Sequence, residues 1–176
     1  HQVYKCRAGD FADTKASVLG DFVAVKLGME EGETPIFLAV TDDYKGHMLF
    51  FFANGKAARV ELSGYQTQTK RKRLTGAYCD KSPLVRAFLL REEMEMAVWS
   101  TEGRCLIFQT AALSPKTTRT TQGVAVMTLK PKWRLDYAAP LAETAIVNQA
   151  RYRARSLPAA GALLRPEDRG EEQLTL

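Results

Sequence analysis

Short apolar runs separated by turn residues dominate the chain and predict an all-β fold. The runs are rich in β-branched and aromatic residues, which is typical of strands that lie half buried in a sheet. The predicted strands are residues 36–41, 48–53, 57–62, 84–90, 96–100, 104–109 and 123–129.

Turn residues lie between these runs and set where hairpins form. Asn54-Gly55 stands between two apolar runs, and both residue types tolerate the positive φ of a type I′ turn, so a hairpin is predicted there. Helical periodicity is weak until residues 142–156, for which a short C-terminal helix or coil is predicted. Residues after Leu164 are charged and are predicted to fray. We therefore expect one domain over 1–164 and a flexible tail over 165–176.

The chain repeats its own pattern at a spacing of 48 residues. Strand aligns with strand, and Gly55 with Gly103, Lys56 with Arg104, Thr69 with Thr117 and Arg71 with Arg119. One deletion then aligns Gly76 with Gly123. A partial third copy opens the chain, where Thr14-Lys15 and Gly20 precede the apolar residues 22–27 in the way that Thr69-Lys70 and Gly76 precede residues 84–90.

A repeat of this length with about four strands has the size of a propeller blade. One blade cannot bury both faces of its sheet, so blades stack around an axis. Three incomplete copies predict either an open disc or a disc completed by further residues on the N-terminal side. The first residue is His1 rather than Met, which suggests a piece of a longer protein or a tag remnant.

Composition narrows the class of protein. The net charge of the chain is +5, and residues 165–176 contain more acidic than basic residues. The rest of the chain, residues 1–164, therefore carries a larger positive net charge than the whole. A basic body suggests a polyanionic partner. The longest apolar run, residues 48–53, is too short to span a bilayer, and no signal peptide is visible. Three widely spaced cysteines predict neither a disulfide framework nor a zinc site, and they fit a reducing cytoplasm.

Basic loops recur at one position of the repeat and are the candidate binding site. Lys and Arg neutralise phosphates and Thr hydroxyls hydrogen-bond to them, so a curved array of such loops would follow a bent duplex without reading its bases. Taken alone, a run of basic residues such as 70–73 is more typical of a solvated surface loop. Its recurrence at one position of the repeat favours the binding function. The candidate residues are Lys15 in the first copy, Lys70, Arg71, Lys72 and Arg73 in the second with Lys81 downstream, and Lys116, Thr117 and Arg119 in the third.

Catalytic patterns are not found in the sequence. His47 lies in a turn with no activated nucleophile pattern near it, and His1 is terminal. The acidic clusters at 30–33 and 92–95 follow apolar runs in equivalent places and are predicted to be turns. No phosphate-binding loop, dinucleotide fingerprint or zinc-protease motif is present. The domain is therefore predicted to have no catalytic residue, metal or cofactor of its own.

Several motifs together resemble the C-terminal repeats of the A subunits of bacterial type IIA DNA topoisomerases, the DNA gyrase and topoisomerase IV family. The likeness covers nearly the whole chain and is greatest to the gyrase-like A subunits of Clostridia and related Firmicutes. It is carried by residues 13–21 (DTKASVLGD), 54–58 (NGKAA), 69–74, 77–84 (AYCDKSPL), 103–104, 114–124 (SPKTTRTTQGV), 152–153 and 157–161 (LPAAG).

The resemblance implies a β-pinwheel, a propeller-like disc whose blades exchange strands and whose basic rim binds and bends double-stranded DNA. It implies a parent enzyme of two A and two B subunits in the bacterial cytoplasm, associated with the nucleoid, that uses ATP and Mg²⁺ to pass one duplex through another. The catalytic tyrosine and the ATPase subunit would lie outside this chain.

One feature departs from gyrase, whose first blade carries a Gln-Arg-Arg-Gly-Gly-Lys-Gly box. No such heptapeptide occurs here, so either it precedes His1 or wrapping is weaker and nearer to that of topoisomerase IV. The acidic tail could compete with DNA for the rim. Two other hypotheses are a propeller-type protein-interaction module without DNA binding and, with least support, a small hydrolase.

Overall fold

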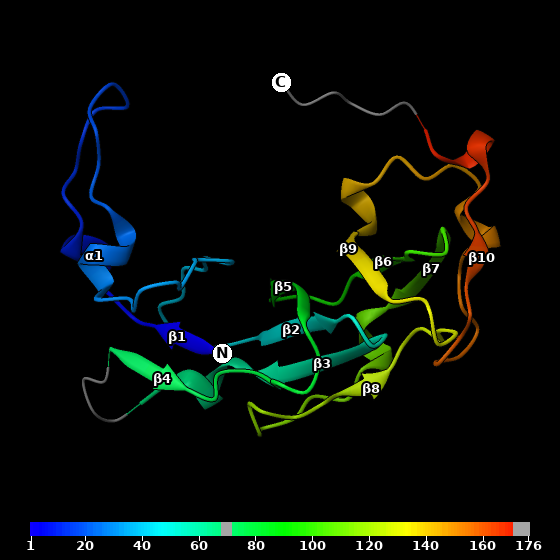
Figure 1. Ribbon diagram of the computed structural model, residues 1–176, viewed down its shortest axis with the longest axis horizontal. Coiled ribbons are helices and arrows are strands. Elements are labelled where there is room, and N and C mark those ends of the chain that lie inside the picture. The colour runs from blue at the N-terminus through cyan, green and yellow to red at the C-terminus, as the bar shows by residue number, and fades with distance from the viewer. Residues whose placement is uncertain (68–71, 171–176) are drawn as a thin grey trace.

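Two four-stranded antiparallel sheets and one two-stranded sheet form the molecule in this computed structural model, which describes residues 1–67 and 72–170 (Figure 1). The strands are β1 (Gln2–Tyr4), β2 (His47–Phe52), β3 (Lys56–Glu61), β4 (Arg73–Thr75), β5 (Leu84–Leu90), β6 (Glu95–Ser100), β7 (Arg104–Gln109), β8 (Val124–Ala125), β9 (Leu135–Pro140) and β10 (Ala162–Leu163). The helices are α1 (Val23–Leu27) and the short 3₁₀ segments η1 (Ala8–Asp10), η2 (Leu62–Tyr65), η3 (Thr110–Ala112), η4 (Leu141–Glu143), η5 (Gln149–Arg151) and η6 (Pro166–Asp168).

The two central hairpins confirm the 48-residue repeat. Phe50 pairs with Ala58 in β2–β3, and Val98 pairs with Leu106 in β6–β7, so both hairpins have the same register. Each turn contains one left-handed residue, Gly55 (φ 79°) or Gly103 (φ 81°). The type I′ prediction was wrong, because Asn54 has no positive φ: the turn closes from the Gly55 N–H to the Phe52 carbonyl (3.0 Å), with glycine as its last residue.

Strand exchange links neighbouring sheets, as predicted. After the β2–β3 hairpin the chain pairs β4 with β1, then adds β5 to β2, and builds the next hairpin before it returns as β8 on β3. The resulting strand orders are β5-β2-β3-β8 and β10-β7-β6-β9. Each complete blade is therefore closed by a strand from further along the chain, so neither blade is a continuous segment.

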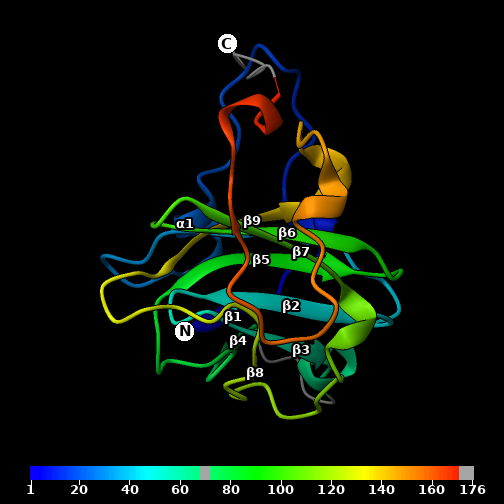
Figure 2. The same ribbon diagram turned by 90° about the vertical axis from the view of Figure 1, so that its right-hand side faces the viewer.

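The core lies between and around these blades, which stack as layers in Figure 2. Leu49 and Phe51 on one face of β2 pack with Met96 and Val98 of β6, while Phe50 and Phe52 on the other face join a second cluster. All four β2 side chains are at most 3% exposed. A strand buried on both faces needs apolar residues at every position, which explains the unbroken run at 48–53, and each buried Phe contributes about 1.5–3 kcal/mol.

Several predicted elements are absent or shortened in the structure. Residues 36–41 form no strand, residues 22–27 contain the helix α1, and the predicted strand 123–129 is only β8. The predicted helix at 142–156 is replaced by η4, η5 and coil, and β9 was not predicted at all. Predictions from local strand propensity were wrong for these segments, because a strand forms only where a partner strand is present and the local sequence does not reveal that partner.

The C-terminal segment is packed as far as the structure describes it. Asp168 is fully buried and accepts hydrogen bonds from Tyr152 Oη (2.5 Å), Asn148 Nδ2 (2.5 Å) and the Arg151 guanidinium. Val147 N–H also donates to the Asp168 carbonyl (3.0 Å). Residues 165–170 are therefore anchored to the coil that follows β9 rather than frayed, and residues 171–176 lie outside the described residues.

Candidate nucleic-acid interface

The outer edges of the sheets carry the loops that the sequence singled out. Strands β5 and β9 contact each other across the two blades, so these edges face the shared axis. Strands β8 and β10 close the opposite edges and lie on the outside, and β4 lies at the outer side of the two-stranded sheet (Figure 1). A ligand that follows the perimeter would therefore meet the chain that enters β4, β8 and β10.

Equivalent backbone hydrogen bonds dock three segments on these edges. The Lys72 carbonyl accepts from Lys5 N–H (2.6 Å), and the Lys116 carbonyl accepts from Glu61 N–H (2.9 Å). Lys116 N–H donates to the Arg59 carbonyl (2.8 Å), and Ala154 N–H donates to the carbonyl of Ile107, the residue 48 positions after Arg59 (2.8 Å). Lys72 and Lys116 therefore dock beside the ends of β1 and β3, and Ala154 docks on β7 as Lys116 docks on β3. The chain at Lys72 runs antiparallel to its neighbour, whereas the chains at Lys116 and Arg153 run parallel to theirs.

Two glycines fix how the docked segments continue. Gly123 (φ 70°) and Gly161 (φ 67°) precede β8 and β10, respectively. A Cβ atom would lie 2.0 Å from the Ala57 carbonyl oxygen at Gly123 and 2.5 Å from the Cys105 carbonyl oxygen at Gly161. No side chain fits at that distance, so glycine is required for each outer strand to approach its sheet.

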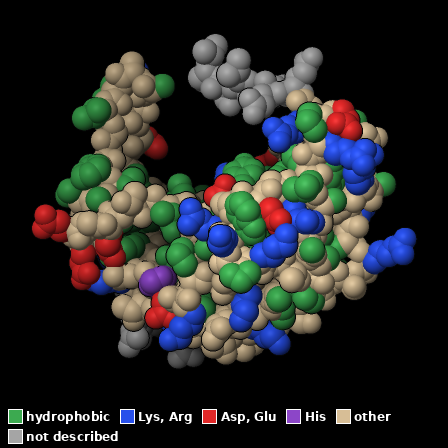
Figure 3. Space-filling model, turned by 45° about the vertical axis from the view of Figure 1, so that its right-hand side comes forward, with side chains coloured by type: hydrophobic (Ala, Val, Ile, Leu, Met, Phe, Trp, Pro, Cys, Tyr) green, Lys and Arg blue, Asp and Glu red, His purple; other side chains and the backbone are tan. Residues whose placement is uncertain are grey.

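Three exposed cations lie at or beside these positions, and we call Lys72, Lys116 and Arg155, which follows Ala154, the outer-edge cations. All three side chains are exposed, and none forms an ion pair with the residues that the structure describes. Thr117 is exposed beside Lys116. Figure 3 shows a face over the sheets where Lys and Arg side chains are densely spread with few acidic side chains between them.

Arg155 was missed because the repeat shortens before it. Gly76 and Gly123 align with one deletion, whereas Gly161 follows Gly123 too closely for the 48-residue spacing. The docking of this segment becomes visible only in the structure, where Ile107 N–H donates to the Tyr152 carbonyl and Ala154 N–H donates to the Ile107 carbonyl. The glycine before β10 was the available sequence signal.

Lys5 is a second residue that sequence reasoning missed. Its Nζ donates to Thr67 Oγ1 (2.5 Å) and to the Tyr65 carbonyl (3.3 Å), and its backbone pairs with Lys72. Burial lowers the pKa of Lys5, and the nearby Arg119 guanidinium lowers it further. Lys5 therefore lies near Arg119 where the chain enters β4, with its ammonium group hydrogen-bonded to η2 and to Thr67.

Arg73 is not available in the way that the sequence predicted. Its guanidinium forms an ion pair with Glu30 (2.7 Å), hydrogen-bonds to Gln2 and lies 5.9 Å from the centre of the Tyr4 ring. The hydrogen bond to Glu30 raises the pKa of Arg73. The acidic segment at 30–33 therefore neutralises one predicted contact.

Arg119 has a structural role in this arrangement. Its guanidinium donates to the Gly64 carbonyl (2.8 Å) and the Gly76 carbonyl (3.4 Å) and lies 6.0 Å from the centre of the Tyr65 ring. These bonds tie the segment that contains Lys116 to η2 and to the turn after β4. Arg119 positions the loop and has fewer donors left for a phosphate.

The other candidates are dispersed. Lys15 lies on the N-terminal segment, which projects away from the sheets in Figure 1. Lys81 is exposed in the turn before β5, next to Ser82, whose Oγ accepts a hydrogen bond from Asn54 N–H (3.1 Å) at the hairpin end of the blade. Lys70 and Arg71 lie outside the described residues. The structure therefore aligns Lys72 and Lys116 with its outer edge, and it does not place Lys15 or Lys81 there.

The described part of the chain contains no group of three or more His, Cys, Asp or Glu residues that could hold a metal ion. Within residues 1–67 and 72–170, no helix has the length and apolar character needed to cross a membrane. His47 lies 3.3 Å from the Arg59 guanidinium, and burial and that cation lower the pKa of His47.

Comparison with known proteins supports the description of the fold. No protein-family model and no curated protein sequence matches the chain. Among solved structures, it is similar to the C-terminal domain of DNA topoisomerase IV (24% identity, TM-score 0.68, 81% of this chain and 45% of that chain). It is also similar to the DNA gyrase A C-terminal domain (21% identity, TM-score 0.52, 72% and 47%), so the chain spans about half the length of the structures that it matches. The chain thus has the β-pinwheel fold of the C-terminal domains of topoisomerase IV and gyrase A.

Proposed function

We propose that this chain is a DNA-binding and DNA-bending part of a type IIA topoisomerase A subunit. The observation that carries the proposal is that exposed cations lie at or beside the docked positions, with Lys72 in the first sheet, Lys116 in the second and Arg155, next to Ala154, in the third. None of the three forms an ion pair with a residue that the structure describes. The fold, which is that of two topoisomerase C-terminal domains, supports the same assignment.

The chemistry of this edge suits a phosphate backbone. Ammonium and guanidinium groups neutralise phosphates and release counterions, and they read no base sequence unless they reach into a groove. Because the three segments lie on successive sheets that turn around one axis, a duplex that contacts all three must curve. Sequence preference would then come from how easily the DNA bends.

In the parent enzyme, this domain would present a curved duplex for strand passage and so influence supercoiling, relaxation or decatenation. ATP and Mg²⁺ would act in the remainder of the A subunit and in the B subunit, in an assembly of two A and two B subunits. We place the enzyme on the bacterial chromosome in the cytoplasm. This chain's own residues bind and bend, and they supply no step of DNA cleavage.

Fluorescence energy transfer across a short duplex tests the proposal directly. Duplexes of a few tens of base pairs, labelled at both ends and differing in sequence, are titrated with the protein over a range of salt. We expect the ends to approach on binding, similar affinities for the different sequences, and a log K that falls linearly with log salt. The absence of binding at low salt would refute the proposal and favour a protein-interaction module.

A further inference from the structure

An arginine side chain is buried between the two four-stranded sheets, which we call the second sheet (β5-β2-β3-β8) and the third sheet (β10-β7-β6-β9). Arg59 of β3 is 9% exposed and lies directly opposite Leu49 of β2. Directly opposed residues share one face of a sheet, so Arg59 faces the side on which Leu49 packs with Met96 of β6. A charge at such a position is costly unless it is paired and hydrogen-bonded.

The partners of this guanidinium come from the end of the neighbouring sheet. Arg59 Nη2 forms an ion pair with Glu93 (2.7 Å), which lies in the turn from β5 to β6. Arg59 Nη1 donates to the carbonyl of Thr110, the first residue of η3 after β7 (3.3 Å). The Thr110 hydroxyl donates to Glu93 (2.6 Å) and accepts from Met94 N–H (2.9 Å). The side chain of a β3 residue therefore holds the region where the third sheet begins and where its hairpin ends.

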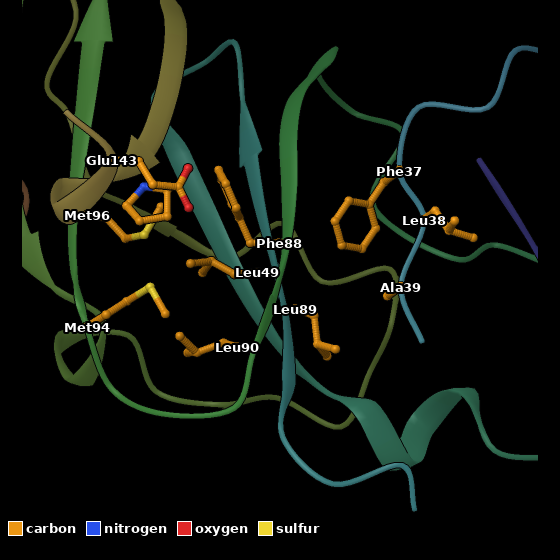
Figure 4. A pocket seen from close by; sticks show the side chains of 11 residues that line it. Phe37, Leu38, Ala39, Leu49, Phe88, Leu89, Leu90, Met94, Met96 and Glu143 are labelled. Atoms are coloured by element: carbon orange, nitrogen blue, oxygen red, sulfur yellow. The ribbon is translucent and has the colours of Figure 1, made fainter. Parts of the chain in front are cut away.

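These directional contacts can fix an angle that apolar packing leaves free. Figure 4 shows Leu49 and Phe88 of the second sheet and Met96 of the third lining one pocket, so the apolar packing between the sheets is incomplete there. Hydrophobic burial is not directional, whereas hydrogen bonds weaken steeply when their geometry changes. The buried Arg59 Nε has no hydrogen-bond partner among the described residues, so separation from Glu93 would leave the charge largely uncompensated.

The same residue supports the outer edge. The Arg59 carbonyl accepts a hydrogen bond from Lys116 N–H (2.8 Å), and Arg155 lies on the segment that docks on the third sheet. The position 48 residues after Arg59 is Ile107, so the repeat does not copy the charged contact. Arg59 therefore links the backbone that holds Lys116 to the sheet that carries Arg155.

We propose that Arg59 is a positioning residue that fixes the angle between the second and third sheets and thereby the curvature that bound DNA adopts. The effect on DNA rests on the proposed function, whereas the angle is a property of the protein alone. Arg59 contacts no phosphate in this scheme. Loss of its guanidinium should let the two sheets move relative to each other while their apolar contacts persist.

His47 makes this contact sensitive to pH. Its Nδ1 lies 3.3 Å from Arg59 Nη2, and a neutral imidazole can accept that hydrogen bond. The charged groups around the ring are Arg59, Glu61 and Glu93. Burial and the Arg59 charge lower the pKa of His47 from its ordinary value of 6.5, and the two carboxylates act in the opposite direction. Protonation at acidic pH would remove the acceptor and place a second cation against Arg59, so the contact should loosen.

Distances between two spin labels measure the angle directly. Ser63→Cys and Ala111→Cys place the labels at exposed, corresponding positions of η2 and η3, and Cys6→Ser removes the exposed native thiol. We expect a narrow distribution of label distances in this parent protein at about pH 7.5. Arg59→Met, which keeps an unbranched side chain without the charge, should broaden that distribution.

Two variants separate this role from a general loss of packing. Arg104→Met removes a cation whose ion pair with Glu102 (3.0 Å) lies within the β6–β7 hairpin, and its distribution should match that of the parent. His47→Gln keeps an acceptor that cannot be protonated, so broadening between about pH 7.5 and about pH 5.5 should occur in the parent and not in this variant. An unchanged distribution in Arg59→Met would overturn the proposal, as would equal broadening in Arg104→Met. A pH response that persists in His47→Gln would overturn the assignment to His47.

DNA bending provides the second measurement. With an end-labelled duplex saturated by protein, Arg59→Met should give a broader range of energy-transfer efficiencies than the original chain. The salt slope of binding should stay the same, because no phosphate contact has been removed. Unchanged energy transfer together with a broadened label distribution would overturn the link between the angle and the curvature. A failure of the original chain to bind DNA would refute the proposed function instead, and the label distances would still decide whether Arg59 fixes the angle.

Discussion

Removal of the three outer-edge cations provides a quantitative test of the DNA contact. The variant carries Lys72→Ala, Lys116→Ala and Arg155→Ala, which are exposed positions without ion pairs among the described residues. If each cation neutralises one phosphate, the slope of log K against log salt should become less steep by about 0.9 per contact, or about 2.7 in total. At 0.1 M salt this corresponds to about 500-fold weaker binding.

Fluorescence anisotropy with a labelled duplex at several salt concentrations measures both quantities. The matched control carries Lys26→Ala, Lys45→Ala and Arg165→Ala, which changes the net charge equally but removes cations paired with Asp21 (3.2 Å), Asp43 (3.5 Å) and Glu167 (3.6 Å). We expect its slope to change by less than about one, because those charges are already paired with carboxylates. Equal losses in the two variants would show that net charge, and not the placement of the cations, controls binding.

Four further predictions concern the residues that build the site and the core. Gly123→Ala should lower the free energy of unfolding in urea by more than about 3 kcal/mol, because its Cβ would lie 2.0 Å from the Ala57 carbonyl oxygen. Gly103→Ala has open space around it and should cost only the left-handed backbone penalty of about 1–2 kcal/mol. Similar losses in the two variants would refute the steric reasoning. Arg119→Ala should speed hydrogen exchange in residues 114–122 and leave the salt slope of DNA binding nearly unchanged, and a slope reduced by about one would instead make Arg119 a phosphate contact. The hydrogen bonds from Tyr152, Asn148 and Arg151 hold the pKa of Asp168 below its ordinary value of 3.8. The stability that this carboxylate contributes is therefore present above pH 3.8 and is lost as the pH falls through the lower pKa of the folded protein. Asp168→Asn should flatten this part of a plot of urea midpoint against pH, and an unchanged plot would contradict the assignment. A thiol reagent at pH 8 should react with Cys6 alone in the folded protein and with all three cysteines in urea. Cys79 and Cys105 are buried, and burial raises the pKa of Cys105 to about 12. Rapid reaction of a second thiol in the folded protein would contradict the packing.

The hairpins and their repeat were readable from local sequence because their determinants are local. Gly55 and Gly103 are needed where the turn requires a positive φ, and alternating burial on two faces produces the run at 48–53. The one error in the turns, the type I′ geometry, arose because Asn54 tolerates a left-handed conformation without adopting it.

Strands with distant partners were less predictable. Strand β9 contains Asp136 and Pro140, both poor strand formers, and it forms because β6 pairs along it from Met96 to Ser100. Residues 36–41 have strong strand propensity and remain unpaired. Propensity measures how well a residue fits a sheet, and it carries no information about whether a neighbouring strand exists.

The proposed DNA interface shows the same division between local and tertiary determinants. Sequence alone determined that basic residues recur with the repeat, and this placed Lys72 and Lys116 among the candidates. Only the tertiary structure decided which cations are free, since Glu30 pairs with Arg73 across 43 residues and two backbone carbonyls engage Arg119. It also added Lys5 and Arg155. Residue type is a property of the chain, but the charge that a ligand meets depends on neighbours brought together by folding, and these are distant in sequence.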